Sequence, residues 1–294
     1  MDQLEHHGVK GMRWGVRKER VSGSISRAKK GLVETAYATG AKINPRETAY
    51  SIKKVVTKHN KADKLITAYA VDQVRKTGVL PSDETSMKAI TREGMLAHQN
   101  KKYDNLNETD IKRFKKYTDA AVYSRAVNGY LATGTPQEIA KKAAELKESL
   151  SKNKIENQVV YRSSNMKFTT NGLSKKLDSL GEEELSKAFN SFNRNFAGKS
   201  FKETRVYSTS TSPEFAIDTW RKVNPTAAKT YNTYLVIDCK GTPGVLADGR
   251  TTDGKKLVNT RSNQEGILAP NKMTYKKLAW DQERGMFAVH MEAE

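Results

Sequence analysis

Three short stretches of this chain end in side chains that could act together on a charged substrate. Residues 159–162 form an apolar run that ends on the guanidinium of Arg162. Residues 206–210 form a second run, which ends on a series of hydroxyls, and residues 262–268 place the carboxylate of Glu265 at the start of a third. The β-branched and aromatic composition of these runs indicates strands. Three such strands would bring a guanidinium, hydroxyls and a carboxylate into one small polar cleft.

The alternation of a strand decides which of these side chains share a face. Residues two apart point to the same side, so Ser208 lies with Ser210, and Asn263 lies with Glu265. A planar guanidinium such as that of Arg162 suits bidentate binding of phosphate. A fixed carboxylate stabilises the positive charge that develops on a sugar when its glycosidic bond breaks. The residue types therefore indicate a small polar cleft with one sign of charge on each side.

The order and spacing of the three stretches resemble the mono-ADP-ribosyltransferases of the bacterial exoenzyme type, with their arginine, Ser-Thr-Ser and x-x-Glu strands. The resemblance covers roughly residues 105–290. It implies that NAD is the substrate and that no metal is required. Four further segments stand where the family has comparable residues: Tyr117-Thr118, Asn128-Gly129-Tyr130-Leu131, Gly198-Lys199-Ser200 and Lys240-Gly241-Thr242-Pro243-Gly244.

The same resemblance implies a role for each strand residue. Glu265 would stabilise the ribosyl cation and hold the ribose 2′-hydroxyl, while Arg162 would bind the diphosphate. Ser208 would orient Glu265, and Thr209 and Ser210 would shape the nicotinamide pocket. For each residue a purely structural role is the alternative, because hydroxyl-rich strands and surface salt bridges are common without function.

Two helical residues would complete the NAD site, and two positions depart from the family pattern. By resemblance, Asn128 and Tyr117 would contact NAD. Asn263 stands two residues before Glu265, where the family usually has Glu or Gln; it could orient an acceptor but cannot act as a base. Ala132 stands where an arginine often follows the Tyr-Leu pair. The balance between transfer to an acceptor and hydrolysis of NAD therefore stays open.

Composition limits the class of protein. The chain has 294 residues, enough for one or two domains, and a formal net charge of +19, which favours anionic partners or simply a basic surface. The first sixty residues hold 13 Lys or Arg against 5 Asp or Glu, so part of the excess lies outside the transferase-like region. The single cysteine, Cys239, excludes an internal disulfide and a cysteine cluster for zinc, and we expect it to be buried. We expect no membrane span and no secretory signal, because long apolar runs are absent.

The predicted fold class is α+β, with an N-terminal helical region followed by a mixed sheet of the ADP-ribosyltransferase type. We predict a basic, glycine-rich tag or linker over 1–30, a helical region over 31–104, and a catalytic domain over 105–294. That domain would have helices over 105–150 and a mixed sheet over 155–294. Start signals for helices stand at residues 82–84, 107–110 and 135–138. We further expect a helix within 174–196, another after Pro213, and strands at 158–163, 205–210, 233–238, 244–247, 265–269 and 286–291.

Residues 1–17 resemble a short signature at the ends of virion and minor head proteins of tailed bacteriophages. This resemblance implies association with phage capsid or portal components. The leading interpretation is a phage-encoded, virion-associated mono-ADP-ribosyltransferase that modifies a host protein, located in the virion or the host cytoplasm. The alternatives are an NAD glycohydrolase toxin, a catalytically inactive virion structural protein, and a nucleic-acid-binding protein whose affinity would fall steeply with salt.

Overall fold

The computed structural model describes residues 61–119, 121–164, 181–219, 233–258 and 264–294. Residues 62–294 form one compact unit. The tag predicted over 1–30 and the first half of the predicted helical region lie outside the described residues. Six α-helices are described: α3 (Lys61–Thr77), α4 (Glu84–Asn100), α5 (Glu108–Asp119), α6 (Ala121–Thr133), α7 (Gln137–Ser151) and α10 (Glu182–Phe196).

Side-chain caps explain where two of these helices begin. The Asp83 carboxylate accepts a hydrogen bond from the Ser86 N–H at 2.8 Å before α4, and the Asn107 amide oxygen accepts one from the Asp110 N–H at 3.0 Å before α5. Both starts agree with the sequence signals. Helix α7 begins without a side-chain cap, because Pro136 occupies the cap position. The helix nevertheless begins at Gln137, within the start signal at 135–138.

Among the described residues, seven strands form one mixed sheet in the order β2-β4-β7-β5-β9-β8-β3. Strand β9 runs parallel to β5, and the other neighbouring strands are antiparallel. Strands β1 (Lys102–Tyr103) and β6 (Arg250–Thr251) form a separate parallel pair. The seven strands are β2 (Lys154–Ser164), β3 (Ser200–Lys202), β4 (Tyr207–Ser210), β5 (Thr233–Leu246), β7 (Glu265–Leu268), β8 (Lys272–Asp281) and β9 (Met286–Ala293).

Strand β5 is shared by both halves of the sheet. Its first part pairs with β9 from Thr233 to Cys239, and its last part, from Gly244 to Leu246, pairs with β7. Strand β2 pairs with β5 along most of its length, so β2, β4, β7 and β5 close into a ring of neighbours. Gly241 has a φ of +69°, which bends the strand at the point where it changes partner. The sequence prediction of two separate strands, 233–238 and 244–247, is wrong at this point.

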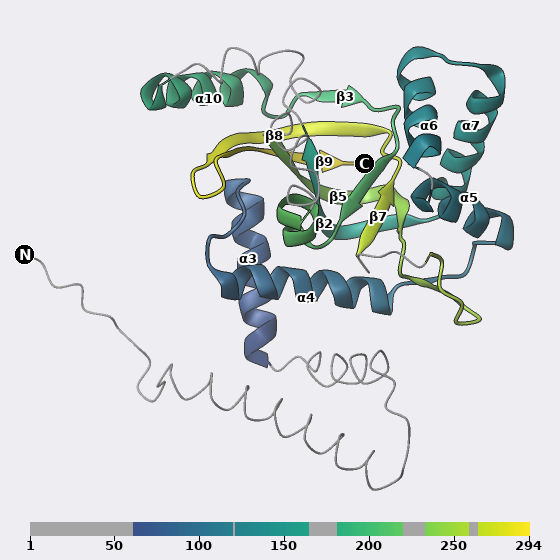
Figure 1. The fold of residues 1–294 in the computed structure, drawn as a ribbon. Helices are drawn as coiled ribbons and strands as arrows, with labels where there is room; N and C mark the ends of the chain where they lie inside the picture. Colours follow the sequence, from purple (N-terminus) through teal and green to yellow (C-terminus); the bar gives the residue numbers. More distant parts are fainter. Residues whose placement is uncertain (1–60, 120, 165–180, 220–232, 259–263) are drawn as a thin grey trace, which may run out of the picture. The chain divides into compact units, whose positions relative to one another are not determined.

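Helices cover both faces of the sheet (Figure 1). Along β2 the side chains alternate: Val160 packs with α10, whereas Val159 and Tyr161 pack with α3 and α4. Helices α5–α7 stand together beside β7 and share a third core that includes Val245 and Ile267. The helices before and after the boundary predicted at residue 104 thus pack on the same sheet. The α+β class is confirmed.

Three further features can be compared with the predictions. The helix expected after Pro213 is described as η1 (Glu214–Thr219), which is π-helical, and residues 220–232 lie outside the described residues. Strands β3 and β8 were not predicted. The described helix α10 begins at Glu182, within the predicted range 174–196, of which residues 174–180 lie outside the described residues.

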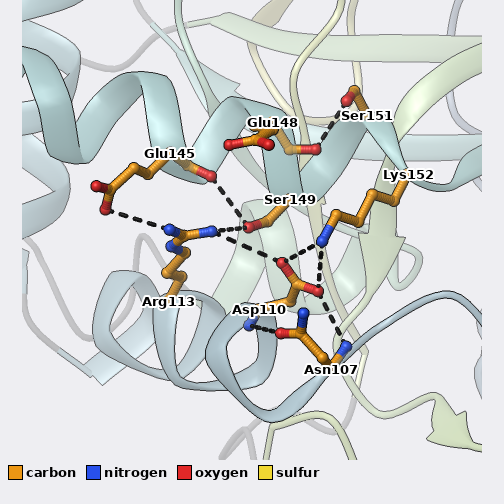
Figure 2. Close-up of polar contacts among 8 residues, drawn as sticks. All are labelled: Asn107, Asp110, Arg113, Glu145, Glu148, Ser149, Ser151 and Lys152. Atoms are coloured by element: carbon orange, nitrogen blue, oxygen red, sulfur yellow. Dashed lines mark hydrogen bonds and ion pairs between the residues drawn. The ribbon is translucent and has the colours of Figure 1, made fainter.

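A polar cluster joins α5 to α7 (Figure 2). The carboxylate of Asp110 is fully buried and accepts hydrogen bonds from Lys152 Nζ at 2.9 and 3.0 Å and from the Asn107 N–H at 3.0 Å. Burial works against ionisation, but the hydrogen bonds from Asn107 and Lys152 hold the pKa of Asp110 below its usual value. Arg113 adds a 3.0 Å hydrogen bond to the Ser149 hydroxyl. The cluster therefore fixes the helix that carries Tyr117.

Two remaining sequence expectations can be compared with the described residues. The Cys239 side chain is buried within the core between the sheet and α10, as predicted. None of the helices in the described ranges combines the length and the apolar character needed to cross a membrane.

Candidate active site

The strand order places the three candidate catalytic residues on adjacent strands. Strand β4 lies between β2 and β7, with Ser210 opposite both Tyr161 and Glu265. Arg162 follows Tyr161 on β2, Ser208 lies two residues before Ser210 on β4, and Glu265 begins β7. Antiparallel pairing brings the end of one strand beside the start of the next, so side chains from three separate segments lie on adjacent strands.

The guanidinium of Arg162 is held by two contacts. Its Nη1 donates a 2.7 Å hydrogen bond to the main-chain oxygen of Ser208, and its Cζ lies 5.4 Å from the centre of the Tyr207 ring. A half-buried guanidinium that stacks on an aromatic ring is oriented before any ligand arrives. Several of its five N–H donors are not used in these contacts.

Glu265 is a half-buried carboxylate with a strongly raised pKa of about 7. Burial is the largest cause, and the negative charge of Asp248 is the second. The Ser208 hydroxyl hydrogen-bonds to the carboxylate and lowers the pKa, whereas the charge of Asp119, the smallest of these causes, raises it. An approaching cation stabilises an ionised carboxylate in such surroundings, because the cation offsets both the cost of burial and the repulsion from the neighbouring negative charge.

Tyr117 and Asn128 connect the helices to the start of β4. The Tyr117 hydroxyl donates to the Val206 main-chain oxygen at 3.2 Å, and the Asn128 amide donates to the Tyr117 hydroxyl at 3.3 Å. The Asn128 amide oxygen accepts from the Val206 N–H at 2.9 Å. The two side chains therefore fix α5 and α6 against the strand that carries Ser208.

Thr209 and Ser210 do not reach the cavity described below. The Thr209 hydroxyl donates to the Gly266 main-chain oxygen at 3.0 Å, and the Ser210 hydroxyl accepts from the Ser212 N–H at 3.0 Å. Both side chains are buried. In this structure they stabilise the pairing of β4 with β7 and the turn that follows β4.

A cavity of about 860 Å³ opens beside Arg162 and Ser208. Its described lining comes from α5, α6, α10 and strands β2–β5, β8 and β9, with aromatic rings at the α10 side and arginines toward α6. Glu265 is not among the lining residues, and Ser208 links it to the cavity. The lining residues are Tyr117, Ser124, Arg125, Asn128, Gly129, Ala132, Arg162, Ser163, Ser164, Phe192, Phe196, Phe201, Arg205, Val206, Tyr207, Ser208, Leu235, Tyr275 and Met291.

The charge of this cavity is positive. The described lining includes three arginines, Arg125, Arg162 and Arg205, and no aspartate or glutamate. Arg205 is paired with the buried Glu203 through hydrogen bonds of 3.1 and 3.0 Å. Arg125 and Arg162 are the other two cationic side chains of the lining, which suits a ligand with phosphate groups.

Sequence analysis did not single out Arg125 or Asp248. Arg125 lies three residues before Asn128 and seven before Ala132, so the three positions share one face of α6. That spacing is the signal that could have identified an arginine on the same face as Ala132. Asp248 follows β5 in a polar segment, and its proximity to Glu265 arises only from the folded chain.

Asn263 lies outside the described residues, as do its neighbours in 259–263. Its predicted contact with an acceptor therefore stays a prediction. Within the described ranges, no group of three or more His, Cys, Asp or Glu side chains is arranged to hold a metal ion.

Comparison with protein families identifies the class of protein. The family model for the ADP-ribosyltransferase exoenzyme matches residues 96–276. The chain belongs to this family, and it is an NAD-dependent ADP-ribosyltransferase with NAD as its substrate. A second model, a family of unknown function (DUF7211), matches residues 1–21. Comparison with curated proteins gives no match.

Three bacterial proteins are among the solved structures that this chain matches. An ADP-ribosyltransferase from Clostridium botulinum, in a triclinic form, is 15% identical, covers 72% of this chain and 96% of its own, and has a TM-score of 0.46. A protein from S. aureus, solved with NAD, is 14% identical, with coverage of 73% and 97% and a TM-score of 0.47. The C3larvin toxin from Paenibacillus larvae, in its orthorhombic form, is 22% identical, with coverage of 64% and 94% and a TM-score of 0.43.

Proposed function

We propose that this protein is a mono-ADP-ribosyltransferase of the arginine, Ser-Thr-Ser, x-x-Glu class, which transfers ADP-ribose from NAD to a host protein and releases nicotinamide. The observation that carries the proposal is the half-buried Glu265 carboxylate, linked through Ser208 to a cavity lined by three arginines. Such a site can bind an anionic diphosphate and stabilise a cationic sugar at the same time. Few other ligands combine these two charges in this way.

The bond that breaks is the N-glycosidic bond between the ribose carbon and the nicotinamide nitrogen. Its electron pair leaves with nicotinamide, which becomes neutral, and the ribose becomes cationic at that carbon. The ionised Glu265 stabilises this cation, and Ser208 holds the carboxylate in place. The nucleophile of the acceptor then forms the new bond to the ribose carbon and loses a proton.

The cavity supplies the binding contacts for the rest of NAD. Arg162 and Arg125 bind the diphosphate, since both present guanidinium groups to the same space. Asn128 and Tyr117 act by fixing the wall formed by α6 and the start of β4. Thr209 and Ser210 support β4, the strand that carries Ser208. The volume of about 860 Å³ is within the range of pockets for drug-sized and cofactor-sized ligands.

The acceptor is the less constrained part of the reaction. Asn263 precedes Glu265 by two residues and can hydrogen-bond to an acceptor group, but it cannot remove its proton. When no acceptor is bound, water can attack the same carbon, and the protein then acts as an NAD glycohydrolase. Both reactions need Glu265, so one substitution tests the shared step.

The test measures nicotinamide release and protein labelling from labelled NAD in a bacterial lysate. We expect wild type to release nicotinamide and label protein, and Glu265→Gln to lose activity by at least about 100-fold, because the electrostatic stabilisation of the cation is lost. Arg125→Ala should raise the KM for NAD more than it lowers kcat, because its contact is to the diphosphate.

Glu183→Gln serves as the matched control, since Glu183 is an exposed glutamate on α10 that pairs with Lys187. It should keep wild-type turnover. Equal activity of wild type and Glu265→Gln would contradict the proposed role of Glu265. Absence of turnover in the wild type, with a folded protein, would favour the inactive structural alternative.

We propose further that the protein is phage-encoded and virion-associated, and that residues 1–17 attach it to capsid or portal components before it acts in the host cytoplasm. The support is the separate family match of residues 1–21 and the basic, glycine-rich composition of this segment. Its match lies outside the range of the transferase match, which begins at residue 96.

Deletion of residues 1–17 tests this attachment. The shortened protein should be lost from purified particles by at least tenfold, while its NAD turnover stays at the wild-type level. Full incorporation of the shortened protein would contradict the proposed attachment.

A further inference from the structure

The segment that leads into β4 is organised around one buried carboxylate. The Glu203 side chain is only 3% exposed. Its Oε1 accepts hydrogen bonds from the main-chain N–H groups of Thr204 and Arg205 at 2.8 and 2.9 Å and from Arg205 Nε at 3.1 Å. Its Oε2 accepts from Arg205 Nη2 at 3.0 Å and from the Tyr207 hydroxyl. One carboxylate therefore fixes both the Arg205 guanidinium and the hydroxyl end of Tyr207.

The charge of Glu203 is compensated within the chain. Burial works against ionisation, but the hydrogen bonds from Arg205 and Tyr207 hold the pKa of Glu203 below its usual value. A buried carboxylate with such partners does not need a cationic ligand, in contrast to Glu265. Any effect of Glu203 on the reaction must therefore pass through the side chains that it holds.

The Tyr207 ring contacts the guanidinium groups of two arginines. The Cζ of Arg162 lies 5.4 Å from the centre of the ring, and that of Arg205 lies 5.6 Å from it. At these distances a cation is attracted to the face of an aromatic ring. Arg162, Arg205 and Tyr207 all line the cavity of about 860 Å³.

The two guanidinium groups differ in the donors that they offer to this cavity. Arg205 uses Nε and Nη2 in its hydrogen bonds to Glu203. Arg162 uses Nη1 in its 2.7 Å hydrogen bond to the Ser208 main-chain oxygen, and this bond leaves Nε and Nη2 for a phosphate group. The Tyr207 ring is the side chain against which this guanidinium rests, so the direction of its remaining donors depends on the ring.

We propose that Tyr207 and Glu203 are positioning residues for Arg162: the Tyr207 ring holds the Arg162 guanidinium in the orientation that receives a diphosphate, and Glu203 fixes the ring through its hydroxyl. This inference deepens the proposed function, in which Arg162 binds the diphosphate of NAD, and it rests on that function. The conformational entropy that a long arginine side chain would lose on binding is then lost beforehand, when the chain folds. Neither positioning residue has to touch the reacting atoms.

The first experiment measures binding of ADP-ribose to the full chain by isothermal titration calorimetry, because ADP-ribose has the diphosphate but no nicotinamide. We expect Tyr207→Leu to weaken binding by about tenfold, which is the size of a partly buried contact between a cation and a ring. Tyr207→Phe keeps the ring and loses only the hydroxyl, so it should weaken binding by about threefold. Tyr69→Leu, at an exposed tyrosine of α3, is the matched control and should bind like wild type.

A double variant separates positioning from a general loss of structure. Arg162→Ala should weaken ADP-ribose binding at least as much as Tyr207→Leu does. Arg162→Ala combined with Tyr207→Leu should match Arg162→Ala alone within about twofold, because Tyr207 acts through Arg162. A further loss of about tenfold in the double variant would overturn the proposal, since Tyr207 would then contact the ligand itself or only stabilise the fold. Wild-type affinity in Tyr207→Leu would overturn it as well.

Proton–nitrogen NMR of the arginine side chains tests Glu203, and it decides the question even if Tyr207→Leu does not fold. The Arg162 Nε–H signal is identified as the one that disappears in Arg162→Lys. A proton above an aromatic ring resonates at a lower frequency than an exposed one, so we expect this position in wild type. A wild-type signal at the position of exposed arginines would overturn the role of Tyr207.

Glu203→Gln replaces one carboxylate oxygen by an amide that donates, and it should move the Arg162 signal toward the position of exposed arginines. The exposed Glu183→Gln variant should leave the signal unchanged. NMR is the measurement for this variant because the released Arg205 would itself attract an anion. An unchanged Arg162 signal in Glu203→Gln would overturn the role of Glu203.

NAD turnover gives the last measurement. Tyr207→Leu should raise the KM for NAD by about tenfold and lower kcat by less than about threefold, because Arg162 binds the diphosphate and takes no part in bond breaking. A merely structural role would lower kcat through loss of folded protein and leave KM unchanged. Binding of ADP-ribose without any NAD turnover in wild type would contradict the proposed function and leave the positioning role intact. Turnover with the same KM in wild type and Tyr207→Leu would contradict the positioning role alone.

Discussion

Two carboxylates of this protein experience opposite surroundings, although both are removed from most of the solvent. Asp110 on α5 is fully buried and is held by Lys152, by the Asn107 main chain and, at 3.8 Å, by Arg113. Among the described residues, two acids, Asp248 and Asp119, contribute negative charge at Glu265 on β7. The pKa of Asp110 is held below its usual value, and that of Glu265 is raised to about 7.

The difference separates a buried negative charge that the folded chain itself compensates from one that a bound cation would compensate. The α5–α7 cluster compensates its buried charge within the chain, which is the arrangement expected of a structural site. The β7 site leaves the compensation to an incoming cation, which is the arrangement expected of a binding or catalytic site. Substitutions at the two sites should therefore change stability in opposite directions.

The larger effect is expected at the α5–α7 cluster. Lys152→Met removes the main partner of the buried Asp110 and should lower the free energy of unfolding at pH 7 by about 3 kcal/mol, because an uncompensated charge is left inside. The pKa of Asp110 is lowered in the folded protein, so its stabilising contribution exists above the unfolded value of 3.8 and is lost as the pH falls through the folded value. Urea unfolding of wild type and variant at several pH values measures this difference.

The double variant Asp110→Asn with Lys152→Met is the control for that experiment. It removes the charge together with its partner and should recover part of the loss. The difference in unfolding free energy between wild type and Lys152→Met should also narrow as the pH falls through the lowered pKa of Asp110 in the folded protein. A gap that is independent of pH would show that Lys152 stabilises the helices by packing alone.

A smaller effect, of the opposite sign, is expected at Glu265. The folded pKa of about 7 is above the value of 4.5 in the unfolded chain, so the stability associated with Glu265 is complete below pH 4.5 and is lost as the pH rises through 7. Glu265→Gln removes this loss and should be more stable than wild type by about 2 kcal/mol at pH 8.5. Thermal unfolding at pH 8.5 and pH 5 checks this, since the two proteins should nearly coincide at pH 5.

The exposed Glu183→Gln variant is again the reference, and it should show no such dependence on pH. If Glu265→Gln were less stable than wild type at pH 8.5, the contrast between the two carboxylates would be wrong, and Glu265 would have a compensating partner in solution.

Sequence patterns predicted the central strands better than the edge of the sheet. The apolar runs in β2 and β7, and the β-branched and aromatic pair Val206-Tyr207 at the start of the β4 run, indicated strands. Strand β8 escaped notice because a register shift between Tyr275 and Lys277 breaks its alternation, and three lysines interrupt its apolar positions. The Gly241-Thr242-Pro243 segment of β5 has the composition of a turn, but pairing with β2 keeps it extended.

From the sequence, only those residues of the candidate site that belong to a recognisable motif could be predicted. Arg162, Ser208 and Glu265 were found by resemblance, and the structure places them on neighbouring strands. Thr209 and Ser210 share that motif but are buried in strand pairing, because alternation and the turn after β4 direct their hydroxyls elsewhere. Glu203 belongs to none of these motifs, so only the fold could show that its carboxylate holds Tyr207.

The bend in β5 has a mechanical consequence. One continuous strand holds β9 through its first half and β7 through its second, and the carboxyl-terminal residues of the chain lie in β9. Releasing Glu265 from its place would pull on the same backbone that anchors the end of the chain. Because β5 pairs with both β7 and β9, we expect the backbone amides of these two strands to exchange with solvent at similar rates.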